Sequence, residues 1–345
     1  MTASTRLALA TAALLVGAVG VRAVTATDVP DAAREASGTI AGSALPATRQ
    51  AAPPTVRWHP ARPAAGALIA IVVAPASTAP ADAVAGVDGT IAGQPITFTR
   101  RDDGSWTGVG GIPIDSAGTV IAPLTIHRVD GTTEPAPATI AVTEGSYRLE
   151  RLSVAPRFGQ APNAALARRQ AEEAARARAV SERSLQTPRL WGGAFVRPRG
   201  TRITSGFGHG RQFNGVVQSR HMGTDFAGAV GTPVRAANCG VVALVADFYL
   251  AGRAIYLDHG AGLVSGYFHL SSAAVAEGDT VRAGAVIGAV GATGRVTGPH
   301  LHWILRHGTT TVDPMSVFAL ADSAAPALAP PAQPCVAAST SSAAR

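Results

Sequence analysis

The 345-residue chain contains no lysine, so all 29 of its basic residues are arginine. This absence excludes several kinds of chemistry. A phosphate-binding loop of the Walker type needs a lysine, a pyridoxal enzyme forms its Schiff base on one, and a biotinyl or lipoyl carrier is modified on one. The formal net charge of +7 could favour acidic partners. Because the arginines are scattered and not interleaved with aromatic residues, we expect no nucleic-acid partner.

Aromatic residues (5%) and charged residues (15%) are scarce, whereas glycine (38) and proline (24) are abundant. Hydrophobic residues make up 47% of the chain, which is enough for real cores and unlike a disordered protein. Few aromatics with many glycines favour small β-rich domains over a helical bundle. The length suggests two domains of ordinary size, or three small ones.

Residues 1–26 have the pattern of a secretory signal peptide. Arg6 supplies a positive charge, residues 7–21 are apolar or small, and cleavage is expected after Ala23 or Ala26. The apolar run is shorter than the roughly 18 residues of a membrane span, although retention as an anchor is the alternative. No later segment could span a membrane. We therefore expect export to the periplasm or cell envelope, without a stable membrane span after signal removal.

Only two cysteines are present, Cys239 and Cys335. Their spacing fits no zinc motif. In an oxidising compartment they could form a disulfide that fastens the C-terminal tail to the domain carrying Cys239. Two unpaired thiols are the alternative.

The segment before residue 152 is predicted to be a linker followed by a β-domain. Residues 27–54 are rich in alanine, threonine, serine and proline, as linkers are. Residues 55–151 contain short strands separated by turn signals such as Asp103-Gly104. This spacing predicts a small antiparallel β-sandwich of the immunoglobulin type.

The remainder is predicted to be a helix, a second β-domain and a tail. Asn163 can cap a helix within 163–187, whose charges on most faces predict a solvent-exposed spacer. Residues 190–320 contain short strands punctuated by glycines and hold seven of the nine histidines. Residues 321–345 return to alanine, proline and serine and are predicted to be a flexible tail.

The clearest chemical pattern is His300-Leu301-His302. On a strand, residues two apart point to the same face, so the two imidazoles should project together. They could share one metal ion, or one could bind the metal while the other acts as a base. A pair of surface histidines on an edge strand is the alternative.

A second pattern is His221 with Asp225, separated by Gly223, where a bend would let the two side chains converge. Imidazole and carboxylate are both zinc ligands, and a catalytic zinc takes three protein ligands and leaves a fourth position for water. A nearby neutral histidine could then take a proton. Taken alone, the spacing of His221 and Asp225 is a weak signal.

The order His-x-x-x-Asp, then His, then His-x-His resembles the lysostaphin-type (LytM-domain) zinc endopeptidases of bacterial cell walls. The resemblance runs from about Gly200 to Pro314, and the upstream sandwich and helix are similar to those of some Gram-negative members. Five further motifs support it: Ser205-Gly206-Phe207-Gly208, Gly231-Thr232-Pro233-Val234, Asp258-His259-Gly260, Glu277-Gly278-Asp279 and Gly291-Ala292-Thr293-Gly294.

The resemblance implies that His221, Asp225 and His302 bind zinc (Zn²⁺) and that His300 is the general base. His269 would orient the attacking water or stabilise the oxyanion. The implied reaction is hydrolysis of peptide cross-links of peptidoglycan by a zinc-activated water, with stem peptides as substrate. D,D-cleavage of a direct meso-diaminopimelate cross-link is favoured by the Gram-negative resemblance.

The alternative function is a non-catalytic cell-wall-binding regulator or amidase activator with an occluded site. The presence of all three ligand positions and both helper histidines favours the enzyme. The sequence does not reveal whether the N-terminal region covers the groove, whether a regulatory protein partner is required, or how many subunits assemble.

The other histidines are expected to have no catalytic part. His59 and His127 are expected at the surface, His259 is expected to be structural, and His307 is expected to be exposed in a hairpin. Three residues near the entry motif could line the substrate groove or contact the peptide: His209, Arg211 and Asn214.

Overall fold

The computed structural model describes residues 52–79 and 82–320. The predicted signal peptide, nearly all of the 27–54 linker, the predicted tail and Cys335 of the expected disulfide lie outside these residues. The described residues belong to one compact unit. Among the described residues, no helix is long and apolar enough to cross a membrane.

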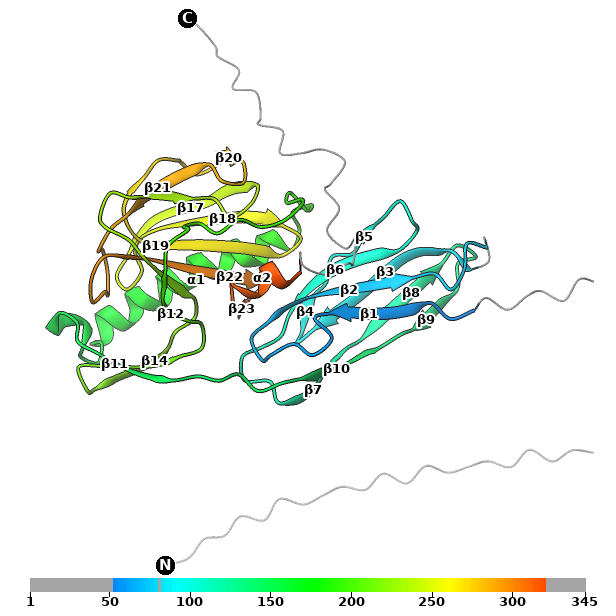
Figure 1. Ribbon diagram of the computed structural model, residues 1–345, viewed down its shortest axis with the longest axis horizontal. Helices are drawn as coiled ribbons and strands as arrows, with labels where there is room; N and C mark the ends of the chain where they lie inside the picture. Colours follow the sequence, from blue (N-terminus) through cyan, green and yellow to red (C-terminus); the bar gives the residue numbers. More distant parts are fainter. Residues whose placement is uncertain (1–51, 80–81, 321–345) are drawn as a thin grey trace, which may run out of the picture. The chain divides into compact units, whose positions relative to one another are not determined.

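The first described segment is a β-sandwich made of short antiparallel strands (Figure 1). Alternate side chains of one strand, Ile69, Ile71 and Val73, are fully buried and share a core with Ile126 of the facing sheet. The strands are β1 (Thr55–His59), β2 (Leu68–Ala74), β3 (Val84–Ile91), β4 (Gln94–Pro95), β5 (Thr99–Arg100), β6 (Trp106–Gly111), β7 (Gly118–Ala122), β8 (Leu124–Arg128), β9 (Thr133–Pro135) and β10 (Ala138–Val142). They form two four-stranded sheets, β1-β2-β6-β5 and β4-β3-β8-β9, and a β10-β7 pair.

The strand β11 (Leu149–Leu152) lies at the predicted end of the sandwich but pairs with a later part of the chain. It runs parallel to β13 (Gly210–Phe213), which also pairs with β14 (Val217–Arg220). A short 3-10 helix, η2 (Pro156–Phe158), follows β11. A segment upstream of the predicted 190–320 domain is thereby joined to that domain.

The helix α1 (Ala164–Ser184) begins as predicted, because the side chain of Asn163 accepts a hydrogen bond from the backbone N–H of Leu166. Its second half is not the solvent-exposed spacer that was expected. Ala177 and Val180 are only 3% and 1% exposed and belong to a core cluster with the strands of the C-terminal sheet. Small residues form this buried stripe, and the charges on the other faces hide it in the sequence pattern.

The C-terminal domain is built on one ten-stranded antiparallel sheet with the main order β12-β15-β22-β19-β18-β17-β20. The predicted mainly β architecture, with antiparallel sheets in both domains, is confirmed. The elements are β12 (Ile203–Ser205), β15 (Thr224–Ala227), β16 (Pro233–Arg235), β17 (Gly240–Phe248), β18 (Gly252–Gly260), β19 (Leu263–Ala273), β20 (Thr280–Val281), β21 (Val286–Val290), β22 (His300–His307), β23 (Thr310–Val312) and the short helix α2 (Ser316–Ala319).

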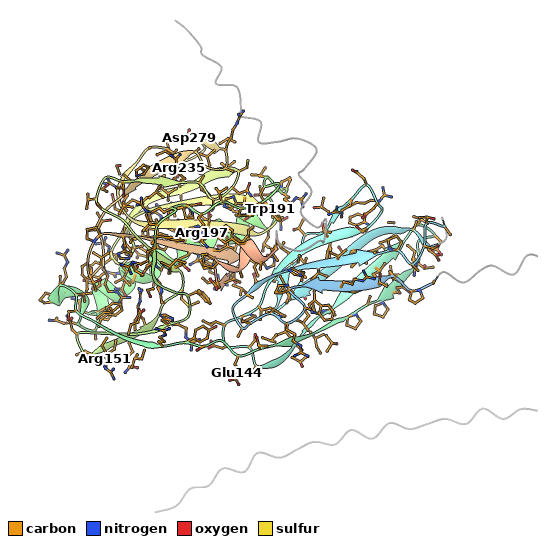
Figure 2. All side chains as sticks on the ribbon, in the orientation of Figure 1. Glu144, Arg151, Trp191, Arg197, Arg235 and Asp279 are labelled. Carbon is orange, nitrogen blue, oxygen red and sulfur yellow. The ribbon has the colours of Figure 1, made fainter. Side chains whose placement is uncertain are left out.

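A large apolar cluster holds this sheet rigid. Trp191, labelled in Figure 2, is 2% exposed and packs in one cluster with Phe226, Tyr267 and Trp303, which are fully buried. Burial of aromatic side chains of this size is a dominant stabilising contribution in a domain core. Phe226 and Trp303 lie on β15 and β22, so the core fixes the two strands that carry the candidate site.

Two histidines outside the candidate site are fully buried. His259 is structural, as predicted: its ring nitrogens lie 2.6 Å from the carbonyl oxygen of Cys239 and 2.7 Å from Oγ of Ser265. His307 contradicts the prediction of an exposed hairpin position, because it is 0% exposed and its Nδ1 accepts a hydrogen bond from the backbone N–H of Gly111 at 3.3 Å. A glycine turn shows where the chain reverses, but it does not show which other segment packs against it.

Burial of His307 should make the protein less stable in acid. Burial lowers its pKa to about 4, so between about pH 6.5, the ordinary value for histidine, and pH 4 the unfolded chain binds a proton that the folded chain does not. The free energy of unfolding should therefore fall as the pH is lowered through this range, by up to about 3 kcal/mol from this residue. Urea denaturation of the metal-free protein at several pH values measures the slope.

The variant His307→Gln should have a smaller slope than the wild-type protein, whatever its absolute stability. His127→Gln is the matched control, because the side chain of His127 is 40% exposed and pairs with the exposed Asp88. An unchanged slope in His307→Gln would show that His307 does not control the acid response.

Candidate metal centre

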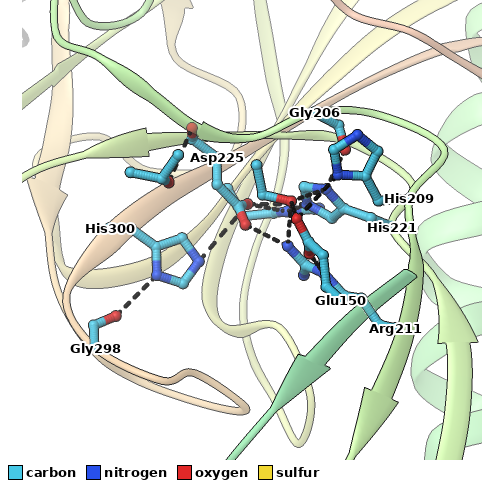
Figure 3. Close-up of polar contacts among 11 residues, drawn as sticks. Glu150, Gly206, His209, Arg211, His221, Asp225, Gly298 and His300 are labelled. Carbon is cyan, nitrogen blue, oxygen red and sulfur yellow. Dashed lines mark hydrogen bonds and ion pairs between the residues drawn. The ribbon is translucent and has the colours of Figure 1, made fainter. Parts of the chain in front are cut away.

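Neighbouring antiparallel strands bring three donor atoms together. The register of β15 and β22 places Asp225 opposite His302, and Oδ1 of Asp225 lies 2.7 Å from Nδ1 of His302. His221 precedes β15, and its Nε2 lies 3.0 Å from that Oδ1 and 2.9 Å from Nδ1 of His302. Figure 3 shows His221 and Asp225 facing each other. All three residues are buried and form a group that could hold a metal ion.

The close approach depends on Gly223, which lies in a bend between His221 and β15, as the sequence predicted. A Cβ atom at this position would lie 2.5 Å from the carbonyl oxygen of Trp303 and 2.7 Å from the ring of His302. No unstrained Cβ contact is that short, so only glycine lets β22 pack against this bend.

We expect Gly223→Ala to separate the three donor atoms. The added methyl group should destabilise the fold by about 1–3 kcal/mol, as overpacking does, and should weaken zinc binding at least tenfold. Denaturant unfolding and zinc titration against a competing chelator measure the two effects. Gly200→Ala is the control, because no atom lies within 4 Å of the place that its added methyl group would take. Equal zinc affinity in both variants would contradict this role of Gly223.

The chemistry of the three residues fits a zinc ion. The carbonyl of Gly206 accepts a hydrogen bond from Nδ1 of His221 at 2.6 Å, so Nε2, 3.0 Å from Oδ1 of Asp225, is the ring atom that faces the other two donors. Burial lowers the pKa of His302 to about 4, so its ring is neutral at neutral pH. Burial raises the pKa of Asp225, but hydrogen bonds with His221 and His302 hold it well below its usual value. Two imidazoles and one carboxylate form a suitable donor set for zinc.

Two more histidines border this group, and His300 is the nearer to Asp225. Its Nε2 lies 3.7 Å from Oδ1 of Asp225. Its Nδ1 donates to the carbonyl of Gly298 at 2.8 Å (Figure 3). Because a carbonyl can only accept, Nδ1 carries the proton and Nε2 is free to accept another.

His269 lies beside His300, with the two ring centres 4.9 Å apart. Its Nδ1 donates to the carbonyl of Thr293 at 2.9 Å, so its Nε2 also lacks a proton. Burial, together with the nearby His300 and His302, lowers its pKa well below the usual value. Its backbone φ of +63° is rare for a residue with a Cβ atom, and such strain tends to cluster at active sites.

Behind Asp225 lies a polar network that the sequence did not predict in full. Nη2 of Arg211 donates to Oδ2 of Asp225 at 2.6 Å, and its Nε donates to Glu150 at 3.1 Å. Glu150, on β11, also accepts from Oγ of Ser205 and bonds His209 (Figure 3). Burial raises the pKa of Glu150, but the hydrogen bonds from His209 and Ser205 and the charge of Arg211 leave it lowered.

Of the three residues that could contact substrate, Arg211 lines the cavities described below, whereas His209 is held by Glu150. Asn214 does neither, because its side chain bonds the backbone N–H and carbonyl of Val154. No pattern in the sequence indicated that Glu150 belongs to the site, because this residue precedes the helix α1 and reaches the site only through the pairing of β11 with β13.

Two cavities flank the three donor residues. The larger, of about 350 Å³, has Asp225 and His300 in its wall. The smaller, of about 190 Å³, has His269 and His302 in its wall. Three side chains line both cavities: Arg211, Phe213 and Arg295. A buried donor set with two free imidazoles beside open cavities is the arrangement of a metallohydrolase.

Residues 219–314 match the family model described as Peptidase family M23. This part of the chain is an M23 peptidase domain, and at the level of this family the resemblance to lysostaphin-type endopeptidases is confirmed. All five site histidine and aspartate residues fall inside the match.

Several proteins are similar to the chain. The DD-carboxypeptidase/endopeptidase Mpg of Neisseria meningitidis is 44% identical over 119 residues, which are 34% of this chain and 27% of Mpg. The peptidoglycan DD-endopeptidase ShyA of Vibrio cholerae is 46% identical over 85 residues, 25% of this chain and 20% of ShyA. The chain thus spans about a quarter of the length of these curated relatives. A crystal structure of a protein assigned to peptidase M23 from Pseudomonas aeruginosa gives a TM-score of 0.56 at 25% identity, covering 75% of this chain and 96% of that one.

Proposed function

We propose that the protein is an exported zinc metallo-endopeptidase that hydrolyses peptide cross-links of peptidoglycan. The observation that carries the proposal is the convergence of His221, Asp225 and His302 beside two unprotonated imidazole nitrogens within an M23 domain. The names of Mpg and ShyA support peptidoglycan as the substrate class and a D,D-bond as the target. Export is supported by the signal pattern of residues 1–26, since peptidoglycan lies outside the cytoplasmic membrane.

In this proposal His221, Asp225 and His302 hold the metal ion. A bound zinc ion would polarise the scissile carbonyl and make water a better nucleophile at neutral pH. Arg211 keeps Oδ2 of Asp225 engaged at 2.6 Å and so leaves Oδ1 directed toward the two histidines. The network behind Asp225 therefore orients the carboxylate.

His300 is the proposed general base. With Nδ1–H bonded to Gly298, its Nε2 takes the proton of the attacking water and can later deliver it to the leaving amine. Asp225, whose Oδ1 is 3.7 Å away, stabilises the imidazolium that exists between these two steps.

His269 is proposed to orient the attacking water. The resemblance implied either this role or stabilisation of the oxyanion. An oxyanion needs a donor, whereas the low pKa of His269 keeps Nε2 unprotonated and able only to accept. This argument supports the first role.

Turnover on purified sacculi tests the proposal against the non-catalytic regulator. The cavities beside the metal ligands support an accessible site rather than an occluded one. The full chain with zinc should release soluble muropeptides, chelator should stop the release, and mass spectrometry should show cleavage at the D,D-bond of the direct cross-link. A folded, zinc-loaded protein that releases nothing would favour the regulator.

A further inference from the structure

Arg295 is a partly buried cation that has no anionic partner among the residues that the structure describes. It lies in the loop between β21 and β22, with its guanidinium carbon 4.0 Å from the ring centre of Phe213. Within residues 52–79 and 82–320, its backbone N–H donates to the carbonyl of Leu250 at 2.9 Å, whereas its side chain forms no hydrogen bond or ion pair. Burial, together with the charge of Arg211, lowers its pKa to about 10, so it stays charged at neutral pH. A partly desolvated guanidinium is stabilised by an anion that reaches its N–H groups, and the two cavities that Arg295 lines give such an anion access.

The position of Arg295 relates such an anion to the reacting centre. Its side chain lines both the cavity that contains His300 and the cavity that contains His302. Arg295 therefore borders both of the cavities that the proposed metal ligands also line. A substrate group bound to Arg295 would share a cavity with the proposed reacting centre.

The charge balance of the larger cavity favours an anion. Its wall contains Arg202, Arg211 and Arg295 against the carboxylates of Glu150 and Asp225. Both carboxylates are already bonded to Arg211. Arg202 is exposed to solvent, so Arg295 is the partly buried cation of this wall that remains to neutralise a charge brought by the substrate.

We propose that Arg295 binds a free carboxylate of the substrate peptide, next to the scissile bond. A guanidinium offers parallel N–H groups that match the two oxygens of a carboxylate, and the face of Phe213 holds it in place. The inference rests on the proposed function. In a direct meso-diaminopimelate cross-link, the carbon that bears the scissile nitrogen also bears a free carboxylate. Arg295 is therefore the residue that distinguishes this cross-link from one whose carboxylate is amidated.

Binding and turnover of two matched substrates test the proposal. The substrates are a cross-linked muropeptide dimer with the free carboxylate and the same dimer amidated at that position. Binding is measured by calorimetry on the full chain carrying His300→Ala, which keeps Arg295 while slowing cleavage. Arg295→Gln should weaken binding of the free dimer about 10- to 100-fold and leave the amidated dimer unchanged. Arg295→Lys should recover part of the loss.

Arg235→Gln is the matched control, because Arg235 (Figure 2) is an exposed arginine of the same domain that lines neither cavity. It should bind and cleave both dimers as the wild-type protein does. Preference of the wild-type protein for the free dimer is itself an expected result, so the test holds even if Arg295→Gln does not fold.

The outcomes separate the two proposals. Equal treatment of both dimers by the wild-type protein, or equal weakening of both by Arg295→Gln, would overturn the role of Arg295 while leaving the endopeptidase intact. Arg295-dependent binding of the free dimer without any cleavage would support this inference and contradict the proposed function. A purely structural role, in which Arg295 only packs on Phe213, predicts loss of stability without a change in the preference between dimers.

Discussion

His302→Ala should abolish release of muropeptides and most of the zinc content. His302 contributes one of three converging donor atoms, with Nδ1 2.7 Å from Oδ1 of Asp225 and 2.9 Å from Nε2 of His221. Removing it leaves two ligands where a catalytic zinc needs three. The loss of metal chemistry should lower kcat/KM at least about 1,000-fold, since the metal contributes several kcal/mol to the reaction. Zinc per chain after dialysis and the rate of release from sacculi measure the two effects.

Unfolding of His302→Ala would also release zinc, so loss of the ligand must be distinguished from loss of the fold. The ring of His302 stacks on Phe268 with centres 5.4 Å apart, and its removal could destabilise the domain. His302→Gln keeps more of this volume and should show the same loss of zinc. His127→Ala is the matched control, since His127 is only half-buried and lies in the sandwich, on β8. Full zinc content and full turnover in His302→Ala would contradict the assigned ligand set.

The site residues near one another in sequence could be predicted because their geometry is local. His300 and His302 share a face of one strand, and the bend at Gly223 allows His221 to approach Asp225. What the sequence could not show is the register that places Asp225 opposite His302. That register depends on packing of the whole sheet. From the sequence, only the family resemblance indicated that Asp225 and His302 belong to one site.

Residues that reach the site from distant segments were not predicted. Glu150 arrives through a parallel pairing of β11 with β13, and no short-range pattern identifies such a partner. Arg295 is only five residues before His300, but its stacking on Phe213 and its lack of an ionic partner among the described residues are properties of the fold. A sequence shows that an arginine is present, and only the structure shows which side chains surround its charge.

Burial was predicted well for strands and poorly where small or polar residues are buried. The alternation of Ile69, Ile71 and Val73 indicates one buried face directly. The buried stripe of α1 contains Ala177 and little strongly apolar surface, so it was interpreted as exposed. The prediction that His307 is exposed was wrong because the residues that bury it come from β6, almost 200 residues earlier in the chain.

His300→Ala should stop turnover while zinc stays bound, which would separate catalysis from metal binding. His300 is not among the three converging donors, and its Nε2 is 3.7 Å from the nearest oxygen of Asp225. Loss of a general base typically costs about 100- to 10,000-fold in kcat. Because the cavity of about 350 Å³ adjoins the vacated position, added imidazole should restore part of the rate in His300→Ala but not in His302→Ala. Parallel loss of zinc and turnover in His300→Ala would instead make His300 a ligand, and unchanged turnover would leave His269 as the stronger candidate for the base.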